Sequence, residues 1–440
     1  MKLFDLKFLK TTLKVIVPLL FMTAASSQAA DTVKILRERM PAYWARIDAV
    51  RNARTRISTS YYFIRTDRVG STYLAELAAA AHRGVKVEVL IDGMSPLDSG
   101  TLRYLDDAGV ELKFFHPAPF QKLGVPLIEA FKRPVRNLRY RMHDKLLLVD
   151  DQKGIFGGRN MADDYFEEDG IFNDIDVMIT AADENSVLSD VRDYFDEVFS
   201  QPSVKKARNL KADDDEMEQT VQWFDEKLKN SDKDYSSEPI RAILSTLTQD
   251  TDLIDRDNIR FLHDPATGKK KHGAGIAHDL WSMIAAANSS VKIIAPYLIF
   301  TPETEKVVAQ LRSDKNIPVE FMTNSVTSMD DEAGLIAALS RGEIARVAKY
   351  GVTAREQLGE QTLHMKMAII DGSRTYVGSY NFDPRSYYFN SEIGIVMDSP
   401  AIANKFEAVY QSIDSIPVDS AASPGFSFSR FKSSLIKRDL

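Results

Sequence analysis

Two short segments of the chain carry a histidine and a lysine at the same spacing. His143 is followed by Lys145 and His364 by Lys366, with one residue between the two in each case. Both segments alternate like β-strands, and a period of two directs the histidine and the lysine to the same face. Cleavage of a phosphodiester without a metal ion requires a nucleophile, an acid for the leaving alkoxide and fixed positive charge. Two facing His–Lys pairs would supply all three.

The agreement between the two segments continues beyond these pairs. Each histidine is followed by Asp at the seventh position, Gly at the fourteenth and Asn at the seventeenth. A single His-x-Lys would mean little, because most histidines are surface residues or satisfied core residues. Only two of the seven histidines share the whole pattern, so we assign no catalytic role to the other five, which are His82, His116, His263, His272 and His278.

The aspartates of this pattern are Asp150 and Asp371. They lie an odd number of positions from their histidines and fall in turn-like sequence. A carboxylate at such a place can cap the backbone of the turn. We therefore expect both aspartates to be structural motif residues rather than catalytic residues.

Small residues end the strand that returns after each histidine. With little side-chain volume there, the backbone and the asparagine that follows can approach the histidine and a ligand closely. The residues are Gly157, Gly158 and Asn160 in the first segment and Gly378, Ser379 and Asn381 in the second.

The elements that would position these segments also occur twice. Apolar alternation and helical spacing predict a strand–helix–strand unit before each histidine, and two copies of one domain explain the repetition. The fold class that we expect is α/β. The predicted units comprise a strand at 57–64, a helix at 71–83 and a strand at 85–91, and then a strand at 291–300, a helix from Pro302 and a strand at 317–323.

The duplication also predicts the domain boundaries. We expect an N-terminal lobe at residues 31–202 and a C-terminal lobe at 256–440, each with one histidine motif. Residues 203–255 are dense in charge, which predicts a solvated, helix-containing linker or insertion. Its role, including a regulatory or partner-binding one, stays open.

Residues 1–30 have the pattern of a targeting segment. Four lysines precede an apolar run from Val15 to about Ala25, and small residues follow at 27–29. This pattern predicts a signal peptide and export, to the periplasm or out of the cell. The alternatives are an N-terminal helix of the folded domain and an uncleaved anchor, although the run is shorter than the roughly 18 residues that span a membrane.

Composition excludes several classes of function. The chain has 440 residues and no cysteine, which excludes disulfides, thiolate metal sites and a thiol nucleophile. Its formal net charge of −7 argues against a protein that coats nucleic acid by bulk electrostatics. We expect no metal, no cofactor and no nucleic-acid partner, and an anionic ligand would need a local basic site. The oligomeric state stays open.

Taken together, the paired motifs resemble the phospholipase D superfamily, whose mark is HxKxxxxD followed by a glycine and an asparagine, in two copies. The segments RMHDKLLLVDD, GGRNMADDYF and GSYNFDPRSYYFNSEIGIV look like the motif blocks of its bacterial cardiolipin synthase and phospholipase D branch. The resemblance covers nearly all of residues 40–415. It implies two similar lobes, each a mixed β-sheet flanked by helices, with one active site at the pseudo-twofold interface.

The resemblance also implies a role for each motif residue. His143 would attack phosphorus to give a phosphohistidine, while His364 would protonate the leaving alcohol and then deprotonate the acceptor. Glu392 and Asp174, at corresponding places after the two asparagines, would orient the imidazoles. The alternative for these acids is a polar residue on an exposed strand. The phosphoryl oxygens would be held by Lys145, Lys366, Asn160 and Asn381, and Gly158 and Ser379 complete the expected substrate-binding residues.

The stretch before His143 is basic and apolar together. Such a segment can lie at an anionic lipid surface, but the same pattern fits an ordinary basic helix with a core-facing stripe. Residues 426–440 are a second, weaker membrane candidate. The basic residues of the stretch are Lys122, Lys132, Arg133, Arg136, Arg139 and Arg141.

We therefore expect an exported glycerophospholipid phosphatidyltransferase or phospholipase D that works through phosphohistidine and associates peripherally with the membrane. Its substrates would be glycerophospholipids such as phosphatidylglycerol or phosphatidylcholine. Water as acceptor would give phosphatidic acid and a phospholipid hydroxyl would give cardiolipin, and the motif leaves this choice open. Two alternatives remain. One is a nuclease on the same fold, which the acidic body disfavours, and the other is a non-catalytic lipid-binding protein.

Overall fold

The computed structural model describes residues 29–95, 97–116, 140–206, 212–267, 275–325 and 334–418. Three predicted features lie wholly or largely outside these ranges: the signal peptide at 1–30, the basic stretch before His143 and the tail at 426–440. Among the helices within these ranges, none combines the length and the apolar character needed to cross a membrane.

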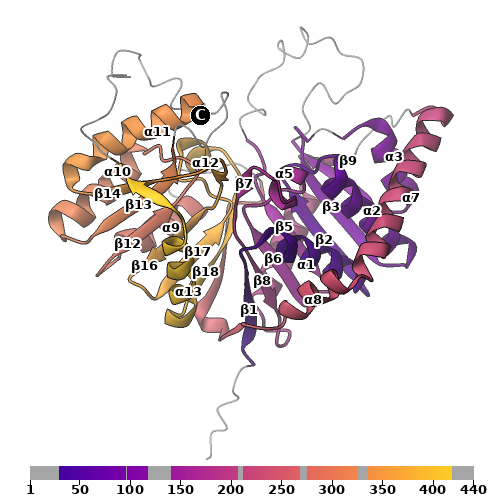
Figure 1. The fold of residues 1–440 in the computed structure, drawn as a ribbon, viewed down its shortest axis with the longest axis horizontal. Helices are drawn as coiled ribbons and strands as arrows, with labels where there is room; N and C mark the ends of the chain where they lie inside the picture. The colour runs from indigo at the N-terminus through magenta and orange to yellow at the C-terminus, as the bar shows by residue number, and fades with distance from the viewer. Residues whose placement is uncertain are drawn as a thin grey trace, which may run out of the picture.

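The N-terminal half of the chain builds one nine-stranded mixed sheet (Figure 1). Its strands are β1 (Asp31–Leu36), β2 (Arg56–Tyr61), β3 (Lys86–Asp92), β4 (Glu111–Phe115), β5 (Lys145–Val149), β6 (Lys153–Gly157), β8 (Asp176–Thr180), β9 (Val204–Lys206) and β10 (Asp252–Ile254). They lie in the order β10-β1-β8-β6-β5-β2-β3-β4-β9. Strands β2, β3 and β4 run parallel because helices connect them, and the other neighbours are antiparallel.

The C-terminal half builds an eight-stranded sheet of the same design. Its strands are β11 (Ile259–His263), β12 (Val291–Ile294), β13 (Val319–Asn324), β14 (Thr353–Gln357), β16 (Met367–Ile370), β17 (Arg374–Gly378), β18 (Ile393–Asp398) and β19 (Ser415–Pro417). The order β11-β18-β17-β16-β12-β13-β14 repeats the order β1-β8-β6-β5-β2-β3-β4 strand for strand. The predicted α/β fold of two similar lobes is confirmed.

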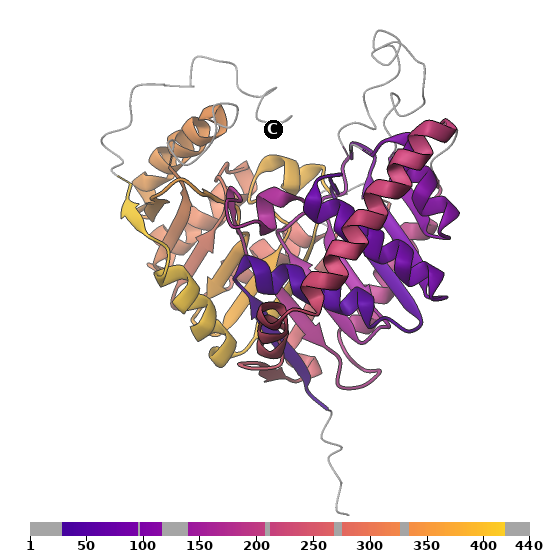
Figure 2. The same cartoon turned by 45° about the vertical axis from the view of Figure 1, so that its right-hand side comes forward.

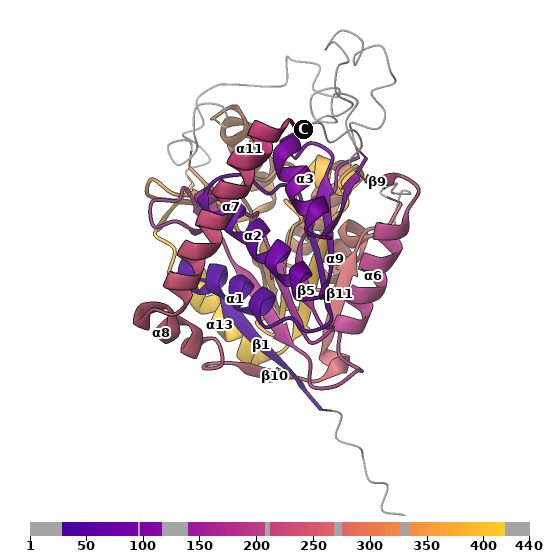
Figure 3. The ribbon, with the colours of Figure 1, turned by 90° about the vertical axis from the view of Figure 1, so that its right-hand side faces the viewer.

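Helices cover both faces of each sheet. Helices α1, α2 and α3 pack on the outer face of the N-terminal sheet, α9 to α11 pack on the outer face of the C-terminal sheet, and α6 and α13 lie on the inner faces. Figure 3 shows α2 and α6 on opposite sides of the N-terminal sheet. The helices are α1 (Arg39–Arg51), α2 (Arg68–His82), α3 (Ser99–Asp107), α5 (Asp163–Phe166), α6 (Leu188–Ser200), α7 (Asp214–Tyr235), α8 (Glu238–Thr246), α9 (Ile276–Ala285), α10 (Pro302–Ala309), α11 (Gly334–Val347), α12 (Pro384–Tyr388) and α13 (Pro400–Gln411), with short turns η3 (Arg256–Asn258), η4 (Gln310–Asp314) and η5 (Ala348–Tyr350).

The inner faces of the two sheets share one apolar core. Phe156 of β6 and Ile395 of β18 belong to it, and the rings of Phe156 and Phe261 lie 6.1 Å apart across the interface. The lobes are also joined through their backbones, because β7 (Phe172–Asn173) pairs in parallel with β15 (Thr362–Leu363). Strand β7 lies between the two lobes in Figure 1. Apolar burial and hydrogen bonds thus hold the two motif segments at one interface.

The described parts of residues 203–255, which the charge density predicts to be a linker or insertion, lie against the N-terminal lobe. Helix α7 crosses α2 and α3 on the outside of this lobe (Figure 2). Phe224 of α7 is buried and stacks on Tyr104 with ring centroids 4.3 Å apart, and Trp223 donates a hydrogen bond to Ser71. Strands β9 and β10 extend the two edges of the sheet. The exact domain boundaries stay a prediction.

The two predicted strand–helix–strand units are present, but the first strand of each is shorter than predicted. The strand predicted at 57–64 ends at Tyr61. The strand predicted at 291–300 ends at Ile294, since Pro296 lacks the N–H that a strand ladder requires. The carbonyl of Pro296 instead accepts hydrogen bonds from the side chains of Thr323 at 3.0 Å and Asn324 at 2.8 Å. The irregular segment that results carries Tyr297.

Candidate active site

His143 lies in the extended segment that enters β5, and the other lobe orients its imidazole. Its Nδ1 is 2.9 Å from Oε2 of Glu392, the residue that leads into β18. The same nitrogen is 3.0 Å from the carbonyl oxygen of Ser379. The backbone N–H of His143 donates to the carbonyl of Ser391 at 2.8 Å. Every one of these partners belongs to the C-terminal lobe.

His364 is held in the reciprocal way by the N-terminal lobe. Its Nδ1 is 2.6 Å from Oδ2 of Asp174, which precedes β8, and its backbone N–H donates to the carbonyl of Asn173 at 2.8 Å. The imidazole also packs against Phe172 and Tyr165, with ring centroids 4.9 and 5.4 Å away.

Glu392 and Asp174 are the acids that the sequence predicts as orienting residues. The structure adds that each lies beside the histidine of the opposite lobe. A carboxylate at Nδ1 keeps the ring proton on that nitrogen, so the lone pair of Nε2 is available on the far side of the ring. Neither imidazole has its partner unless the lobes are docked.

Hydrogen bonds fix the Glu392 carboxylate firmly. Its Oε2 accepts the hydroxyl of Ser379 at 2.5 Å, and its Oε1 accepts Ser386 Oγ at 2.7 Å and Asn390 Nδ2 at 3.2 Å. Burial opposes ionisation, but the charge and hydrogen bond of His143 outweigh it and lower the pKa of Glu392 to about 2. The carboxylate is therefore charged at neutral pH and favours a proton on His143 Nδ1.

Gly158 and Ser379, which the resemblance assigns to substrate binding, both contact these carboxylates. A Cβ on Gly158 would lie 2.3 Å from Asp174 Oδ1, so only glycine leaves room for the shorter acid. Ser379 is fully buried, and its hydroxyl is already bonded to Glu392. The structure thus gives both residues a supporting contact with an orienting acid rather than an open face for a ligand.

The two lysines are buried, and no carboxylate of the described residues is in direct contact with either. Lys145 Nζ donates to the carbonyl of His143 at 2.7 Å, and Lys366 Nζ lies 2.9 Å from Nδ1 of His364. Burial lowers the pKa of Lys145 to about 7 and the pKa of Lys366 to about 8. The charge of Lys366 also lowers the pKa of Lys145, so the two lobes contribute cations to one region.

Asn160 and Asn381 lie on opposite lobes and bond to tyrosines. Asn160 Nδ2 donates to Tyr165 Oη at 3.0 Å and Asn381 Nδ2 donates to Tyr297 Oη at 3.4 Å. Each amide nitrogen carries a second N–H, and within the described residues neither Oδ1 has a hydrogen-bond partner. Both amides therefore retain hydrogen-bonding capacity for a ligand.

Asp150 and Asp371 lie apart from this cluster. The carboxylate of Asp150 accepts the backbone N–H groups of residues 54–56, and that of Asp371 accepts those of residues 288–290. Each aspartate thus caps the loop before the first strand of its βαβ unit, rather than its own turn. Their geometry is that of structural residues.

A cavity of about 250 Å³ opens beside His143. Tyr62, Arg141, Asn381 and Arg385 contribute to its lining, and the Tyr62 ring lies 5.4 Å from the imidazole. Arg141, which the sequence places in a candidate membrane-binding stretch, is buried here. Its Nη1 forms an ion pair with Asp92 at 3.0 Å, so this arginine does not contact a lipid surface.

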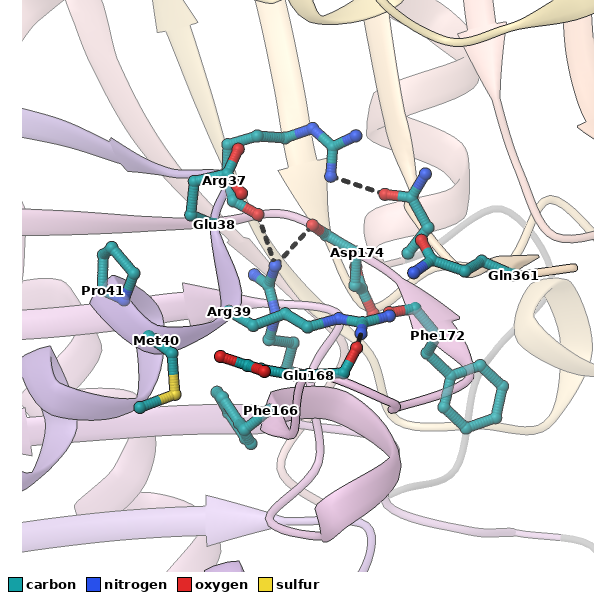
Figure 4. Close-up of a pocket in the computed structure, with 12 residues that line it drawn as sticks. Arg37, Glu38, Arg39, Met40, Pro41, Phe166, Glu168, Phe172, Asp174 and Gln361 are labelled. Carbon is teal, nitrogen blue, oxygen red and sulfur yellow. Dashed lines mark hydrogen bonds between the residues drawn. The ribbon is translucent and has the colours of Figure 1, made fainter. Parts of the chain in front are cut away.

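A group of three arginines, which the sequence reasoning misses, holds the segment that ends in Asp174 (Figure 4). Arg39 donates to the carbonyls of residues 167, 168, 170 and 172 at 2.6–3.0 Å. Arg37 Nη1 donates to Asn173 Oδ1 at 2.5 Å, and Arg159 Nη2 donates to the carbonyl of Asp174 at 2.6 Å. These arginines line a second cavity of about 380 Å³ behind Asp174. Their partners are mostly backbone carbonyls, which leave no signal in a sequence.

The described residues offer no arrangement of three or more His, Cys, Asp or Glu side chains suited to a metal ion. The expectation that the reaction uses no metal stays a prediction. The cations and amides gathered here suit a bound anion, and the paired imidazoles suit proton transfer and nucleophilic attack on it.

Comparison with known proteins agrees with this geometry. A family model described as "Cardiolipin synthase, PLD-like domain" matches residues 47–199 and 280–413. The chain is 29% identical over 403 residues to cardiolipin synthase C of Escherichia coli (strain K12), which covers 84% of this chain and 81% of that protein. Among solved structures, phosphatidylserine synthase of Haemophilus influenzae Rd KW20 has the same fold, with a TM-score of 0.68 at 16% identity over 93% of this chain and 95% of that one.

The arginine group predicts a local loss of stability. We expect Arg39→Met to lower the free energy of unfolding by about 2–3 kcal/mol, because charge-assisted hydrogen bonds to four carbonyls are lost. Urea denaturation measures this, and hydrogen exchange should accelerate at residues 170–174. Arg65→Met is the matched control, since it removes a half-exposed ion pair with Asp164 and a cation–π contact with Phe63, both of which contribute little at an exposed site. Equal stability of the two variants would contradict a stabilising role for the hydrogen bonds of Arg39.

The close contact at Gly158 predicts a second difference. Gly158→Ala should destabilise the protein by about 1–3 kcal/mol, because its methyl group overlaps the Asp174 carboxylate. Gly342→Ala, in helix α11 with nothing within 4 Å of the added methyl, should be neutral or stabilising by up to about 1 kcal/mol. Thermal unfolding of both variants measures this difference in stability. A neutral Gly158→Ala would show that Asp174 is not confined as described.

Proposed function

The chain belongs to the phospholipase D superfamily, in the branch of the cardiolipin synthase PLD-like domain, and on this basis we propose that it is a phosphatidyltransferase that acts on glycerophospholipids through a phosphohistidine. The observation that carries the proposal is the crossed arrangement of the site. Each imidazole has its Nδ1 bonded to a carboxylate of the other lobe, which keeps Nε2 out of these hydrogen bonds. In the proposal, both Nε2 atoms act on one substrate.

In the first half of the reaction, Nε2 of His143 attacks the phosphorus of a phospholipid. A nitrogen–phosphorus bond forms and the bond from phosphorus to the headgroup oxygen breaks. His364, protonated at Nε2, gives its proton to the departing oxygen, so the headgroup leaves as a neutral alcohol. Proton transfer of this kind contributes roughly 10²–10⁴-fold to the rate.

This step requires a proton on His364 that the ligand-free site disfavours. Burial, together with the charge of Lys366, lowers the pKa of His364 to about 3. A bound phosphodiester brings a negative charge between the two lysines and offsets their repulsion of the imidazolium. Substrate binding thereby raises the pKa of His364 and prepares it to act as the acid.

In the second half, His364 takes a proton from an acceptor hydroxyl. The acceptor oxygen attacks phosphorus, the nitrogen–phosphorus bond breaks and His143 is regenerated. Water as acceptor gives phosphatidic acid, and a phospholipid hydroxyl gives a cardiolipin. The covalent intermediate serves both outcomes.

The remaining motif residues hold the phosphoryl group. Lys145 and Lys366 supply positive charge, and the second N–H groups of Asn160 and Asn381 supply hydrogen bonds to its oxygens. Each charge-assisted bond is worth about 1.5–3 kcal/mol when formed in the transition state. Lipid access fits the sequence-based expectation of an exported protein, periplasmic or secreted, that associates peripherally with membranes.

The proposal predicts a lipid product that depends on His143. With phosphatidylglycerol or phosphatidylcholine vesicles and added ethanol, the wild-type protein should form phosphatidylethanol, detected by mass spectrometry of the lipids. His143→Asn should lower this product at least about 10³-fold, because the nucleophile is absent. With ³²P-labelled phospholipid, the same variant should lose protein-bound label.

His278→Asn is the matched control, because His278 is exposed and lies outside the motifs. It should keep the wild-type rate. Label that persists on the His143 variant would move the nucleophile to His364. Degradation of plasmid DNA in the absence of any lipid product would establish the nuclease alternative, and lipid binding without turnover the non-catalytic one.

The pKa shifts of the two buried lysines predict that kcat/KM falls as the pH rises above neutrality. Burial lowers the pKa of His143 below 6.5, so the nucleophile stays neutral until the pH falls below that range. Above about pH 7–8 the buried Lys145 and Lys366 lose their charges, and kcat/KM should fall by about tenfold or more between pH 8 and 9. The kcat profile should extend to higher pH, because a bound anion raises both lysine pKa values. A kcat/KM that rises steadily to pH 10 would contradict these roles.

A further inference from the structure

The cavity behind Asp174 has a wall of arginines that take no part in the proposed reaction. Its volume is about 380 Å³, and none of the described residues lines both this cavity and the one beside His143. Figure 4 shows Met40 and Pro41 at one end and Gln361 at the other. Gln361 precedes β15 of the C-terminal lobe, whereas most of the lining belongs to the N-terminal lobe. The cavity is therefore bounded by both lobes.

The arginines of this wall are Arg37, Arg39 and Arg159, and they retain N–H groups for a ligand. Arg159 is fully buried, and its Nη atoms bond to Asp176 and to backbone carbonyls. Its Nε has no hydrogen-bond partner within the described residues. Arg37 uses Nη1 for the side chain of Asn173, and its Nε and Nη2 take part in none of the hydrogen bonds among the described residues.

The acids nearby do not fully offset the charges of these arginines. Burial and the charge of Arg159 lower the pKa of Arg37. Glu38 and Asp174 act in the opposite direction, but their combined effect is smaller. The pKa of Arg39 is lowered by the same two causes. A bound anion would offset the repulsion among the three guanidinium groups, so the cavity favours a negatively charged ligand.

The duplication of the fold provides an internal comparison. Tyr380 precedes the asparagine of the second motif, as Arg159 precedes Asn160 in the first. Asp264 follows β11, whereas Arg37 follows β1, the equivalent strand of the other lobe. At these two places the C-terminal lobe thus has an aromatic residue and an acid. The duplicated fold forms without arginines there, which points to a role specific to this cavity.

The size and chemistry of the cavity suit a terminal phosphate group. A guanidinium binds phosphate oxygens through paired, charge-assisted hydrogen bonds. The volume of about 380 Å³ lies within the range of about 300–1,000 Å³ that is typical of small-molecule sites, so space remains beyond the phosphate itself. Met40, Pro41 and Phe166 add apolar surface to the lining, which suits the organic part of a phosphate ester.

We propose that Arg37, supported by the charges of Arg39 and Arg159, binds a terminal phosphate group in this cavity, carried by a soluble molecule or by a lipid. No bond is made or broken at this site, and the inference does not depend on the proposed transfer reaction. Because Gln361 of the other lobe lines the same cavity, a bound phosphate ester would lie between the two lobes and stabilise their docked arrangement.

Isothermal titration calorimetry with inorganic phosphate, at constant ionic strength, tests the site. Arg37→Gln should lose one bound phosphate or bind it at least about tenfold more weakly, because a charge-assisted contact is lost. Arg37→Lys should retain part of the affinity. Arg83→Gln is the matched control, since Arg83 also donates to backbone carbonyls, those of residues 50 and 51, but lies outside the cavity. It should bind phosphate like the wild-type protein.

Gln361→Glu tests the same site without altering an arginine. The side chain of Gln361 is exposed, so the substitution is compatible with folding. Its new carboxylate would repel a phosphate in the cavity, and we expect at least about tenfold weaker binding.

A second arm distinguishes the two sources of the phosphate. Phosphatidylcholine vesicles that contain phosphatidic acid are added as competitors to the His143→Asn protein, in which the proposed turnover is blocked. Loss of the Arg37-dependent phosphate binding would identify a lipid-borne phosphate as the ligand. Unchanged binding would identify a soluble one.

Two results would overturn the inference: equal phosphate binding by the wild-type protein and Arg37→Gln, or a Gln361→Glu variant with the wild-type affinity. Failure of the proposed function looks different, because it would abolish transfer to ethanol and leave the difference in phosphate binding intact.

Discussion

The proposed active site depends on two hydrogen bonds that cross between the lobes. The His143 imidazole is hydrogen-bonded to the Glu392 carboxylate, and the His364 imidazole to the Asp174 carboxylate. Each half of the chain therefore supplies the imidazole of one pair and the acid of the other. A histidine without its acid has no fixed tautomer and no defined direction. The shared apolar core and the β7–β15 pairing are therefore conditions for the proposed chemistry, because they set the position of each acid relative to the opposite ring.

The duplicated fold does not give duplicated roles. The acid beside His143 is a glutamate held by Ser379, Ser386 and Asn390, whereas the acid beside His364 is a shorter aspartate that fits only because Gly158 has no side chain. Burial lowers the pKa of both histidines. Lys366 Nζ lies within hydrogen-bonding distance of the His364 imidazole, but not of the His143 imidazole. Unequal surroundings of this kind are what a nucleophile and an acid–base residue require of two similar imidazoles.

The sequence predicts the parts of this arrangement that repetition and spacing encode. The two HxK pairs and the asparagines follow from comparing one half of the chain with the other, whereas the orienting acids also needed the family resemblance. The strand order confirms the expected duplication. What it could not predict depends on tertiary packing. Nothing in the spacing says that Glu392 serves His143 rather than His364. From the sequence, Arg141 belongs to a basic stretch that could lie at the surface. Its buried ion pair with Asp92, a residue distant in the chain, is visible only in the structure.

The central claim of the proposed mechanism is that both imidazoles act on a single phosphorus atom. A crystal structure of the protein with orthovanadate, which mimics the five-coordinate state of phosphorus, tests it most directly. We predict one vanadate between the lobes, with vanadium bonded to Nε2 of His143 and the opposite apical oxygen within hydrogen-bond distance of Nε2 of His364. A vanadate held by one lobe alone, with the other imidazole out of reach, would contradict the account.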